Sequence, residues 1–443
     1  MPARRTFVAA GLIALLLVAA VVAPWLGGLA IVADGLLLVA LLLDARRAAR
    51  TPLLARRLMP PILAQGSAAA CELELTSAAG RVVTVVAREA LHPALAEGPL
   101  RRGFLIPPRG TVRWNYTLVP RRRGEPVLGP LTVRILGPWG LAWAQRDLLP
   151  GEPHRVYPQT RWDGRVGRLL ALAHRRELGQ APLRTQGVGR EPYALREYRP
   201  GDPLTRIHWR ASARHGRLIA REDTWERGRP LVILLDAGRA MVSLDGARSK
   251  LDHALAAALA LTRVAAGRGD RVAIVAFSDR VERLVRVRAG TRGLAHAYGA
   301  LFDLPARLSE PAYDVAAEAL ERTETRRATA VLFTSVVDLA VAELLHETLL
   351  RLRRRHRVIL MNLEDPELTR LALGEPATAE EAFAKTAALE VLLANRRLGR
   401  RLRRAGVHVV TAPADRLTWG GLEAYLSLAE RGRHGRPRAR AAV

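Results

Sequence analysis

Arginine side chains gather in one short segment of the chain, and their spacing is compatible with anion binding. Arg206, Arg210 and Arg214 are four residues apart, so a helix places them on one face. Guanidinium groups bind phosphates and carboxylates through paired hydrogen bonds. Alternatively, the same arginines form ion pairs within the chain, with Glu191, Glu197, Glu222 or Glu226 as partners. The sequence leaves both interpretations open.

The residues before this stripe predict where its helix begins. Pro200-Gly201 suits the centre of a type II turn, and Asp202 follows as a helix N-cap with Pro203 at the first helical position. We therefore predict a helix from Pro203 to about Arg214, ending near Gly216. The residues of this segment that we expect to contact a binding partner are Arg196, Glu197, Tyr198, Pro200, Gly201, Asp202, Arg206, Trp209, Arg210 and Arg214.

Catalytic chemistry has little support in the sequence. Glu197, Asp202 and His208 have the side chains of a general acid–base set, but helix capping and surface pairing explain their positions better. The sequence contains no Walker phosphate loop, no His-Glu-x-x-His, no Gly-x-Ser-x-Gly and no cysteine–histidine signature. We therefore expect no enzymatic activity, no cofactor and no small-molecule substrate.

Two apolar runs occupy the first fifty residues. The first covers residues 7–23, and the second covers residues 26–43 with Asp34 as its only interruption. Each run approaches the roughly 17–25 residues that a membrane span needs. The Pro and Gly residues within 24–28 predict a tight turn between them. We therefore predict a two-helix transmembrane anchor in residues 1–50.

The arginines that flank these runs predict which side of the membrane the rest of the chain occupies. Arg4 and Arg5 precede the first run, five arginines follow the second between residues 46 and 57, and none lies in the connection. The positive-inside rule then places both ends in the cytoplasm, which predicts a two-pass protein of the plasma membrane. The alternative is a signal peptide of the twin-arginine kind. The second run would stop export, so both interpretations leave the soluble part in the cytoplasm.

Charge sets the classes of partner that we consider. The 443 residues include 69 Lys+Arg and 42 Asp+Glu, a formal net charge of +27. Nucleic acid, anionic lipid and an acidic protein are the candidate partners. Arginine clusters at 353–355, 396–404 and 431–440 keep nucleic acid open as an alternative, but aromatic residues are sparse and no nucleic-acid-binding module is present. Lipid and protein partners are therefore favoured.

Pattern changes divide the remaining chain into five parts. Residues 51–70 contain three prolines and predict a linker, and residues 71–158 have the short alternating runs of a small β-sandwich. Residues 159–227 contain the arginine stripe, and we call them the signature segment. Residues 228–415 alternate apolar strands with helices, which predicts a doubly wound, Rossmann-like α/β sheet. Residues 416–443 predict a C-terminal helix and a basic tail. The single cysteine, Cys71, excludes an internal disulfide.

The signature segment resembles the bacterial family called domain of unknown function 58. The resemblance is carried by the run from Leu195 to Asp202, by Arg206-Ile207-His208-Trp209 and by Ala211-Ser212-Ala213-Arg214. Further similar motifs lie upstream at residues 122–158 and downstream at 236–241, 249–254, 269–272 and 331–334. The resemblance implies a von Willebrand factor A-like fold for the α/β domain and a MoxR-type AAA+ ATPase as the partner.

Domains of this kind often hold a divalent cation at the carboxyl ends of their strands, on an Asp-x-Ser-x-Ser motif joined by a Thr and an Asp. Here Asp236 is present, but Gly238 and Ala240 replace the two hydroxyl residues. Ser335 stands where the resemblance leads us to expect an aspartate. A hard cation needs several oxygen ligands, so we expect no metal, and a metal-dependent ligand-binding domain stays as an alternative. We predict a membrane-anchored, non-enzymatic adaptor protein.

Overall fold

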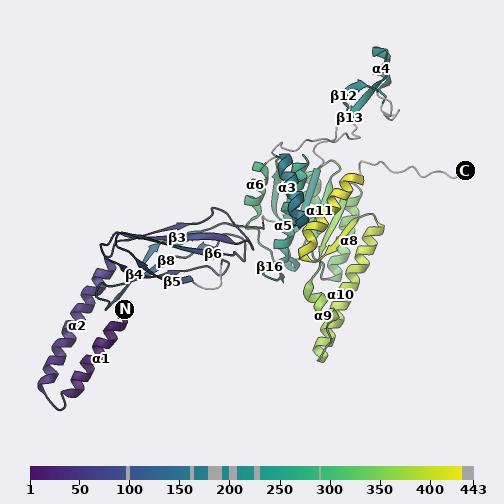
Figure 1. The fold of residues 1–443 in the computed structure, drawn as a ribbon. Helices are drawn as coiled ribbons and strands as arrows, with labels where there is room; N and C mark the ends of the chain where they lie inside the picture. The colour runs from purple at the N-terminus through teal and green to yellow at the C-terminus, as the bar shows by residue number, and fades with distance from the viewer. Residues whose placement is uncertain are drawn as a thin grey trace. The chain divides into compact units, whose positions relative to one another are not determined.

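The computed structural model describes residues 1–95, 100–159, 164–177, 192–198, 207–223, 230–288 and 291–431. The chain forms two compact units, Met1–Gln159 and Thr160–Val443 (Figure 1). Each unit is described by itself below. The structure confirms a mixed α/β chain that carries an apolar N-terminal helix and several sheets.

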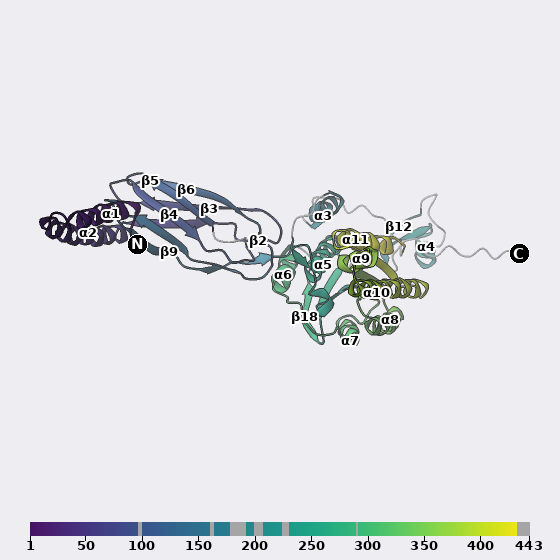
Figure 2. The same cartoon turned by 90° about the horizontal axis from the view of Figure 1, so that it is seen from below.

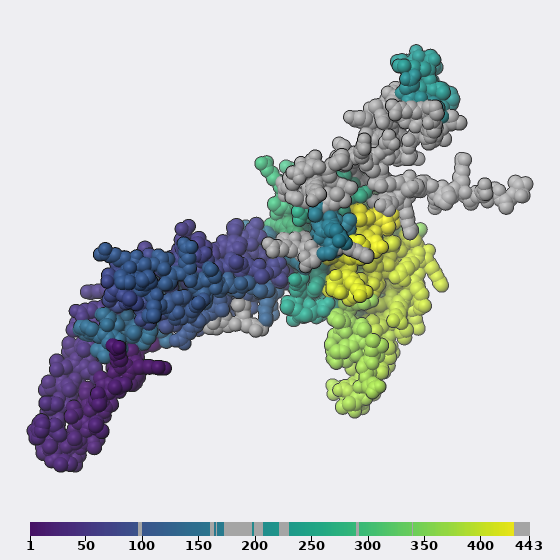
Figure 3. Space-filling view, viewed as in Figure 1, coloured from purple at the N-terminus to yellow at the C-terminus, as the bar shows by residue number. Residues whose placement is uncertain are grey.

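The first unit begins with two helices, α1 (Arg4–Ala19) and α2 (Trp25–Ala49), which project together from its strands (Figure 3). Helix α2 is long and apolar enough to cross a membrane. The turn between the helices covers Ala20–Pro24 rather than the predicted residues 24–28. The glycines Gly27 and Gly28 lie inside α2 because Pro24 already supplies its N-cap. Asp34 is exposed on α2.

Two antiparallel sheets follow and share one hydrophobic core. One sheet has the order β1-β3-β6 and the other β5-β4-β8-β9. The strands of this unit are β1 (Leu53–Leu58), β2 (Leu63–Ala64), β3 (Ala69–Ser77), β4 (Val83–Glu89), β5 (Leu100–Ile106), β6 (Thr111–Leu118), β7 (Val127–Leu128), β8 (Leu131–Leu136), β9 (Trp143–Leu149), β10 (Glu152–Pro153) and β11 (Val156–Tyr157).

The predicted linker, residues 51–70, belongs to this β-domain. Strand β1 pairs along its whole length with β3, and Leu53 and Leu63 are buried. Three prolines suggested an extended connection, but they lie outside β1 and leave its backbone N–H groups free to pair. The β-domain therefore begins directly after α2.

A buried carboxylate joins α2 to the β-domain. Asp44 is fully buried and accepts three backbone hydrogen bonds from the β8–β9 loop: from Trp139 at 2.8 Å, Leu141 at 2.8 Å and Ala142 at 2.9 Å. A Cβ atom at Gly137 would lie 2.2 Å from an Asp44 oxygen, so the loop needs glycine there. The last turn of α2 is thereby fixed to this unit's strands.

The second unit is built on a six-stranded sheet of order β18-β17-β14-β19-β20-β21. Strands β14, β17, β19, β20 and β21 are parallel, while β18 is antiparallel to β17 at one edge. These strands are β14 (Pro230–Asp236), β17 (Arg271–Phe277), β18 (Val281–Val287), β19 (Thr329–Thr334), β20 (Arg357–Leu363) and β21 (His408–Ala412). The apolar sequences of β14, β17, β19 and β20 agree with burial on both faces.

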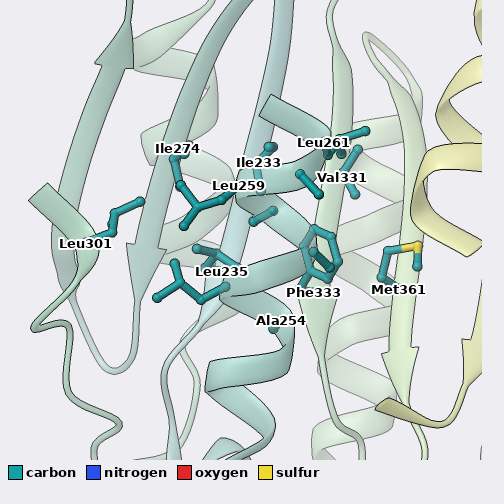
Figure 4. Close-up of a cluster of buried hydrophobic side chains, with 14 of the residues drawn as sticks. Ile233, Leu235, Ala254, Leu259, Leu261, Ile274, Leu301, Val331, Phe333 and Met361 are labelled. Atoms are coloured by element: carbon teal, nitrogen blue, oxygen red, sulfur yellow. The ribbon is translucent and has the colours of Figure 1, made fainter. Parts of the chain in front are cut away.

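Helices cover both faces of this sheet. Ile233 and Leu235 of β14 contribute to the core with α3, α5, α6 and α11 (Figure 4), while Val232 and Leu234 face α7, α8 and α10. Figure 2 shows α5 and α11 on the side of the sheet opposite to α7 and α8. The helices are α3 (Gly164–Glu177), α5 (Lys250–Gly267), α6 (Thr291–Leu301), α7 (Tyr313–Thr323), α8 (Leu339–Arg353), α9 (Pro366–Leu373), α10 (Ala379–Arg404) and α11 (Ala414–Arg431), with short elements η2 (Arg239–Met241), β15 (Leu244–Asp245) and β16 (Arg248–Ser249).

Candidate functional site

The signature segment forms an antiparallel strand pair with a short helix between the strands. Strands β12 (Pro192–Glu197) and β13 (Ile219–Asp223) pair, with Arg196 opposite Ala220. Helix α4 covers only Trp209–His215. Four of the predicted partner-binding residues, Pro200, Gly201, Asp202 and Arg206, lie outside the described residues.

The predicted start of this helix is wrong. Ile207 forms a β-bridge with Ala220, so the backbone is extended at a position that we expected to be helical. His208 is the N-cap, and its Nδ1 accepts a hydrogen bond from the N–H of Ala211 at 3.1 Å. The histidine therefore performs the capping role that we assigned to Asp202, six residues too early.

Helix α4 presents an exposed aromatic and cationic face. Trp209 is 67% exposed, and Arg210 and Arg214 are exposed beside it. The opposite face is anchored because the Ser212 hydroxyl accepts a hydrogen bond from the N–H of Ile219 at 2.9 Å. Trp and Arg are the residues that most often dominate the binding energy of protein interfaces.

The other predicted partner residues lie on the strand pair. Glu197 forms an exposed ion pair with Arg217 at 3.5 Å, so it pairs with a neighbour that our list of internal pairs did not contain. The N–H of Tyr198 donates to the carbonyl of Leu218 at 2.8 Å. The described part of the arginine stripe consists of Arg210 and Arg214.

A second polar cluster lies at the carboxyl ends of the parallel strands, where α/β sheets commonly bind ligands. Asp236 ends β14 and is fully buried. Its Oδ1 accepts the N–H of Gly238 at 2.7 Å, and its Oδ2 accepts the hydroxyl of Thr334 at 2.6 Å. The Tyr313 hydroxyl lies 2.9 Å from the Thr334 oxygen and donates to it, since the Thr334 proton is already committed to Asp236.

Burial is the main influence on the ionisation of Asp236 and Tyr313. It raises the pKa of Asp236 to about 6, and the hydrogen bonds from Thr334 and Gly238 oppose that rise. Burial also raises the pKa of Tyr313 well above its usual value. The cluster is therefore a buried hydrogen-bonded chain in which the carboxyl is close to half-ionised near pH 6.

The ammonium group of a buried lysine lies beside the carboxyl ends of β19 and β20. Lys250, the first residue of α5, is 1% exposed. Its Nζ donates to the Asp365 carboxylate at 2.6 Å and to the Ser335 hydroxyl at 3.0 Å. Ser335 in turn donates to the carbonyl of Leu363 at 3.1 Å. Burial opposes ionisation of Asp365, but the hydrogen bond and charge of Lys250 outweigh it and lower its pKa.

The residues at this edge do not fit a divalent cation. Both oxygens of Asp236 already accept hydrogen bonds, and the nearby charges on Lys250 and Arg239 are positive. Arg239 pairs with Glu310 at 2.5 Å and with Asp338 at 3.6 Å, which removes the two acids that might have replaced missing ligands. Among the described residues, no group of three or more His, Cys, Asp or Glu side chains is arranged to hold a metal.

The loop after Asp236 also has little room for a hydroxyl-bearing side chain at position 238. A Cβ atom at Gly238 would lie 2.9 Å from the Ser309 carbonyl oxygen and 3.2 Å from Pro311. Ala240 lies in the short helix η2, directly before the buried Met241. Positions 238 and 240 therefore carry no side-chain hydroxyl, and position 238 has little space for one.

Sequence reasoning missed Lys250, Tyr313 and Asp365 as members of this cluster. Lys250 offered a signal, because it is one of two lysines among 69 basic residues. Asp365-Pro366 offered another, since this pair is typical of a helix start and Asp365 does cap α9. The direction of both side chains toward Ser335 depends on the sheet order, which the sequence does not contain.

Comparison with solved structures gives weak likenesses. Proximal thread matrix protein 1 from the mussel byssus matches 45% of this chain and 45% of its own, with 15% identity and a TM-score of 0.24. The CARDB domain of a Pyrococcus furiosus protein matches 23% of this chain and 93% of its own, with 13% identity and a TM-score of 0.17. Neither value supports an argument about fold or activity.

Sequence comparison is more informative. Over 204 residues the chain is 28% identical to the uncharacterized protein Rv1480 of Mycobacterium tuberculosis, which covers 45% of this chain and 61% of that protein. The match therefore spans less than two thirds of the relative's length. Residues 194–405, which include both polar clusters, match the family model described as "Protein of unknown function DUF58". Over residues 194–405 this chain is therefore similar to the DUF58 family.

Proposed function

We propose that this protein is a membrane-anchored, non-enzymatic adaptor that binds a protein partner through the exposed face of α4. The observation that carries the proposal is the exposure of Trp209, which is 67% exposed on a helix whose Arg210 and Arg214 are also exposed. Tryptophan and arginine are enriched among the residues that dominate the binding energy of protein interfaces. We define the α4 face as Trp209, Arg210 and Arg214.

The carboxyl edge of the sheet supports a structural rather than catalytic domain. Its charged groups satisfy one another, Lys250 with Asp365 and Asp236 with Thr334. Buried groups that are paired in this way stabilise one conformation and offer few atoms to a substrate. The strand order with an antiparallel edge strand β18 supports the von Willebrand factor A-like assignment, in which loops at this edge present a binding surface.

The N-terminal helices support the anchor. Helix α2 has 25 residues, which is about 37 Å of helix against a hydrocarbon core of about 30 Å. Its apolar side chains, such as Ile31 and Leu36, are exposed, as expected for contact with lipid. Together with α1 it would make a two-pass anchor, and the arginines at both ends favour a cytoplasmic location for the other domains.

The partner that we propose is a MoxR-type AAA+ ATPase, on the basis of family resemblance. The basic α4 face favours an acidic surface on that partner. The test is crosslinking and pull-down of the full-length tagged protein from its own membranes, with nucleotide present. We expect an ATPase of this class among the captured proteins.

A matched pair of variants makes the test specific to α4. Arg210→Glu with Arg214→Glu reverses two charges at a spacing of four residues on α4, and Arg396→Glu with Arg400→Glu does the same on the exposed face of α10. We expect the first pair to lose the partner and the second to retain it. Retention by both variants, or loss by both, contradicts the assignment of the binding face.

A further inference from the structure

An arginine-lined pocket lies at the amino ends of the parallel strands, whereas the Asp236 cluster lies at their carboxyl ends. Its volume is about 480 Å³, and its lining includes Arg327, Arg353, Arg354, Arg357, His356 and His408. Arg357 and His408 are the first residues of β20 and β21. The pocket therefore lies at the amino ends of these parallel strands.

A buried histidine in the lining of this pocket carries an unused donor. His356 is 2% exposed, and its Nδ1 accepts the N–H of Ala328 at 3.2 Å. Burial, assisted by Arg355, lowers the pKa of His356, so the imidazole is neutral at pH 7. With Nδ1 acting as an acceptor, the ring proton lies on Nε2. That Nε2 is buried and has no hydrogen-bond partner among the described residues.

Most of the positive charge of the pocket is not neutralised within the described part of the chain. None of the lining residues is acidic. The acids that act on His356, Glu321 and Glu324, are paired with Arg351 at 3.1 Å and Arg271 at 3.7 Å. Arg327, Arg353 and Arg354 form no ion pair with the residues that the structure describes.

The backbone at Gly406 leaves room for the guanidinium group of Arg353. Gly406 has a φ of +82°, and a Cβ atom there would lie 2.5 Å from a terminal nitrogen of Arg353. Arg357 is held by a hydrogen bond from its guanidinium to the carbonyl of Leu428 at 3.3 Å. Four guanidinium groups and an imidazole N–H are therefore gathered around one space.

We infer that this pocket binds a phosphoryl group, with His356 Nε2 donating to one oxygen and the arginines to the others. A phosphate has enough acceptor oxygens to use several guanidinium groups at once, and such charge-assisted bonds are strong. The bound anion would be either free phosphate or the headgroup phosphate of an anionic lipid. The site is independent of the adaptor function proposed above, since it uses none of the residues of the α4 face.

Calorimetric titration of the full-length protein in detergent micelles, at constant ionic strength, tests the inference. The probes are inorganic phosphate and glycerophosphoglycerol, the water-soluble headgroup of phosphatidylglycerol. We expect one-site binding of at least one probe. Tighter binding of glycerophosphoglycerol assigns the site to a lipid headgroup, and tighter binding of phosphate assigns it to a free anion. Binding of neither probe in the millimolar range overturns the inference.

Two double variants separate the pocket from general charge. Arg327→Gln with Arg354→Gln removes two lining charges, and Arg322→Gln with Arg326→Gln removes two exposed neighbours outside the lining. We expect the first to weaken binding by about tenfold or more, because each lost charge-assisted bond is worth about a factor of ten. The second should change it by less than about twofold, since exposed charges are screened. Equal weakening in both overturns the inference.

The histidine has its own readout. In protein labelled with ¹⁵N-histidine, phosphate should shift the Nε2 signal of His356, which is assigned by its loss in His356→Asn. The asparagine oxygen can still accept the N–H of Ala328, so this variant keeps the local fold while it removes the Nε2 donor. An unchanged His356 signal at saturating phosphate contradicts the proposed geometry.

Discussion

The ammonium group of Lys250 lies 2.6 Å from the carboxylate of Asp365, and this ion pair joins the start of α5 to the start of α9. Ser335, at the end of β19, completes the link with its hydroxyl 3.0 Å from the same nitrogen. A protein cation thereby connects three loops at the carboxyl edge of the sheet. The resemblance had led us to consider a metal ion for that edge.

Replacing this lysine should destabilise the α/β domain strongly. Lys250→Met keeps the chain length but leaves the Asp365 carboxylate without its partner, and breaking a buried pair in this way costs about 3–5 kcal/mol. The expected result is faster amide hydrogen exchange in α5 and β20. The matched control is Lys385→Met, which removes the other lysine, a partly exposed one that donates to the Gly374 carbonyl. Equal protection in the two variants would falsify a structural role for the pair.

Asp236 should make the domain less stable as the pH rises. Its pKa is raised to about 6 by burial, so the folded state binds a proton more tightly than the unfolded state. The corresponding stability is complete below about pH 4 and is lost as the pH rises through 6. The asparagine variant Asp236→Asn carries no charge and can keep partners at Gly238 and Thr334.

The difference in the free energy of unfolding between Asp236→Asn and the original protein isolates the contribution of the Asp236 carboxyl. We expect Asp236→Asn to gain roughly 2–3 kcal/mol relative to the original chain between pH 4 and 7, with no further gain above pH 7. Denaturant unfolding at several pH values measures the difference. A gain that is independent of pH contradicts the raised pKa.

The sequence predicted the parallel strands of the α/β domain well because their apolar runs are long and bounded. The apolar run at residues 230–235 coincides with β14 (Pro230–Asp236), and the helical pattern at residues 313–323 coincides with α7 (Tyr313–Thr323). The edge strand β18 was missed because its arginines and glutamate interrupt the apolar pattern. An edge strand is half solvated, so its sequence need not resemble that of a central strand.

The candidate sites were less predictable than the strands. Asp236 was found because it ends an apolar run, but its partner Thr334 lies 98 residues away in the chain, and Tyr313 comes from a separate helix. The start of α4 was misplaced because Asp202-Pro203 has a stronger capping signal than His208, and histidine is a rare N-cap. The β1 strand was missed because nearby prolines suggested a linker. Long-range pairing decided each of these cases.

The attachment of α2 to the β-domain should depend on Asp44. In Asp44→Asn the side chain keeps one acceptor oxygen, so at least one of the N–H groups of Trp139, Leu141 and Ala142 loses its partner. Each buried donor left unpaired costs about 1–3 kcal/mol. We expect faster hydrogen exchange and proteolysis in the loop at residues 137–142.

The matched control for this change is Asp34→Asn in the same helix. Asp34 is exposed, so its replacement should leave the loop protected. If both variants open the loop equally, the three hydrogen bonds to Asp44 do not fix the helix to the β-domain.

Addition of divalent cations should leave the α/β domain unchanged. Both oxygens of Asp236 accept hydrogen bonds, and the acids Glu310 and Asp338 are paired with Arg239. Titration calorimetry with Mg²⁺ or Mn²⁺ should therefore show no saturable heat, and heat that disappears in Asp236→Ala contradicts this expectation.

Restoring the missing hydroxyls with Gly238→Ser and Ala240→Ser should not create a site. The new Cβ at 238 would lie 2.9 Å from the Ser309 carbonyl, so the loop must move, and overpacking of this kind costs about 1–3 kcal/mol. A stable double variant that binds Mg²⁺ would mean that the loop can open and that only the ligands were lost.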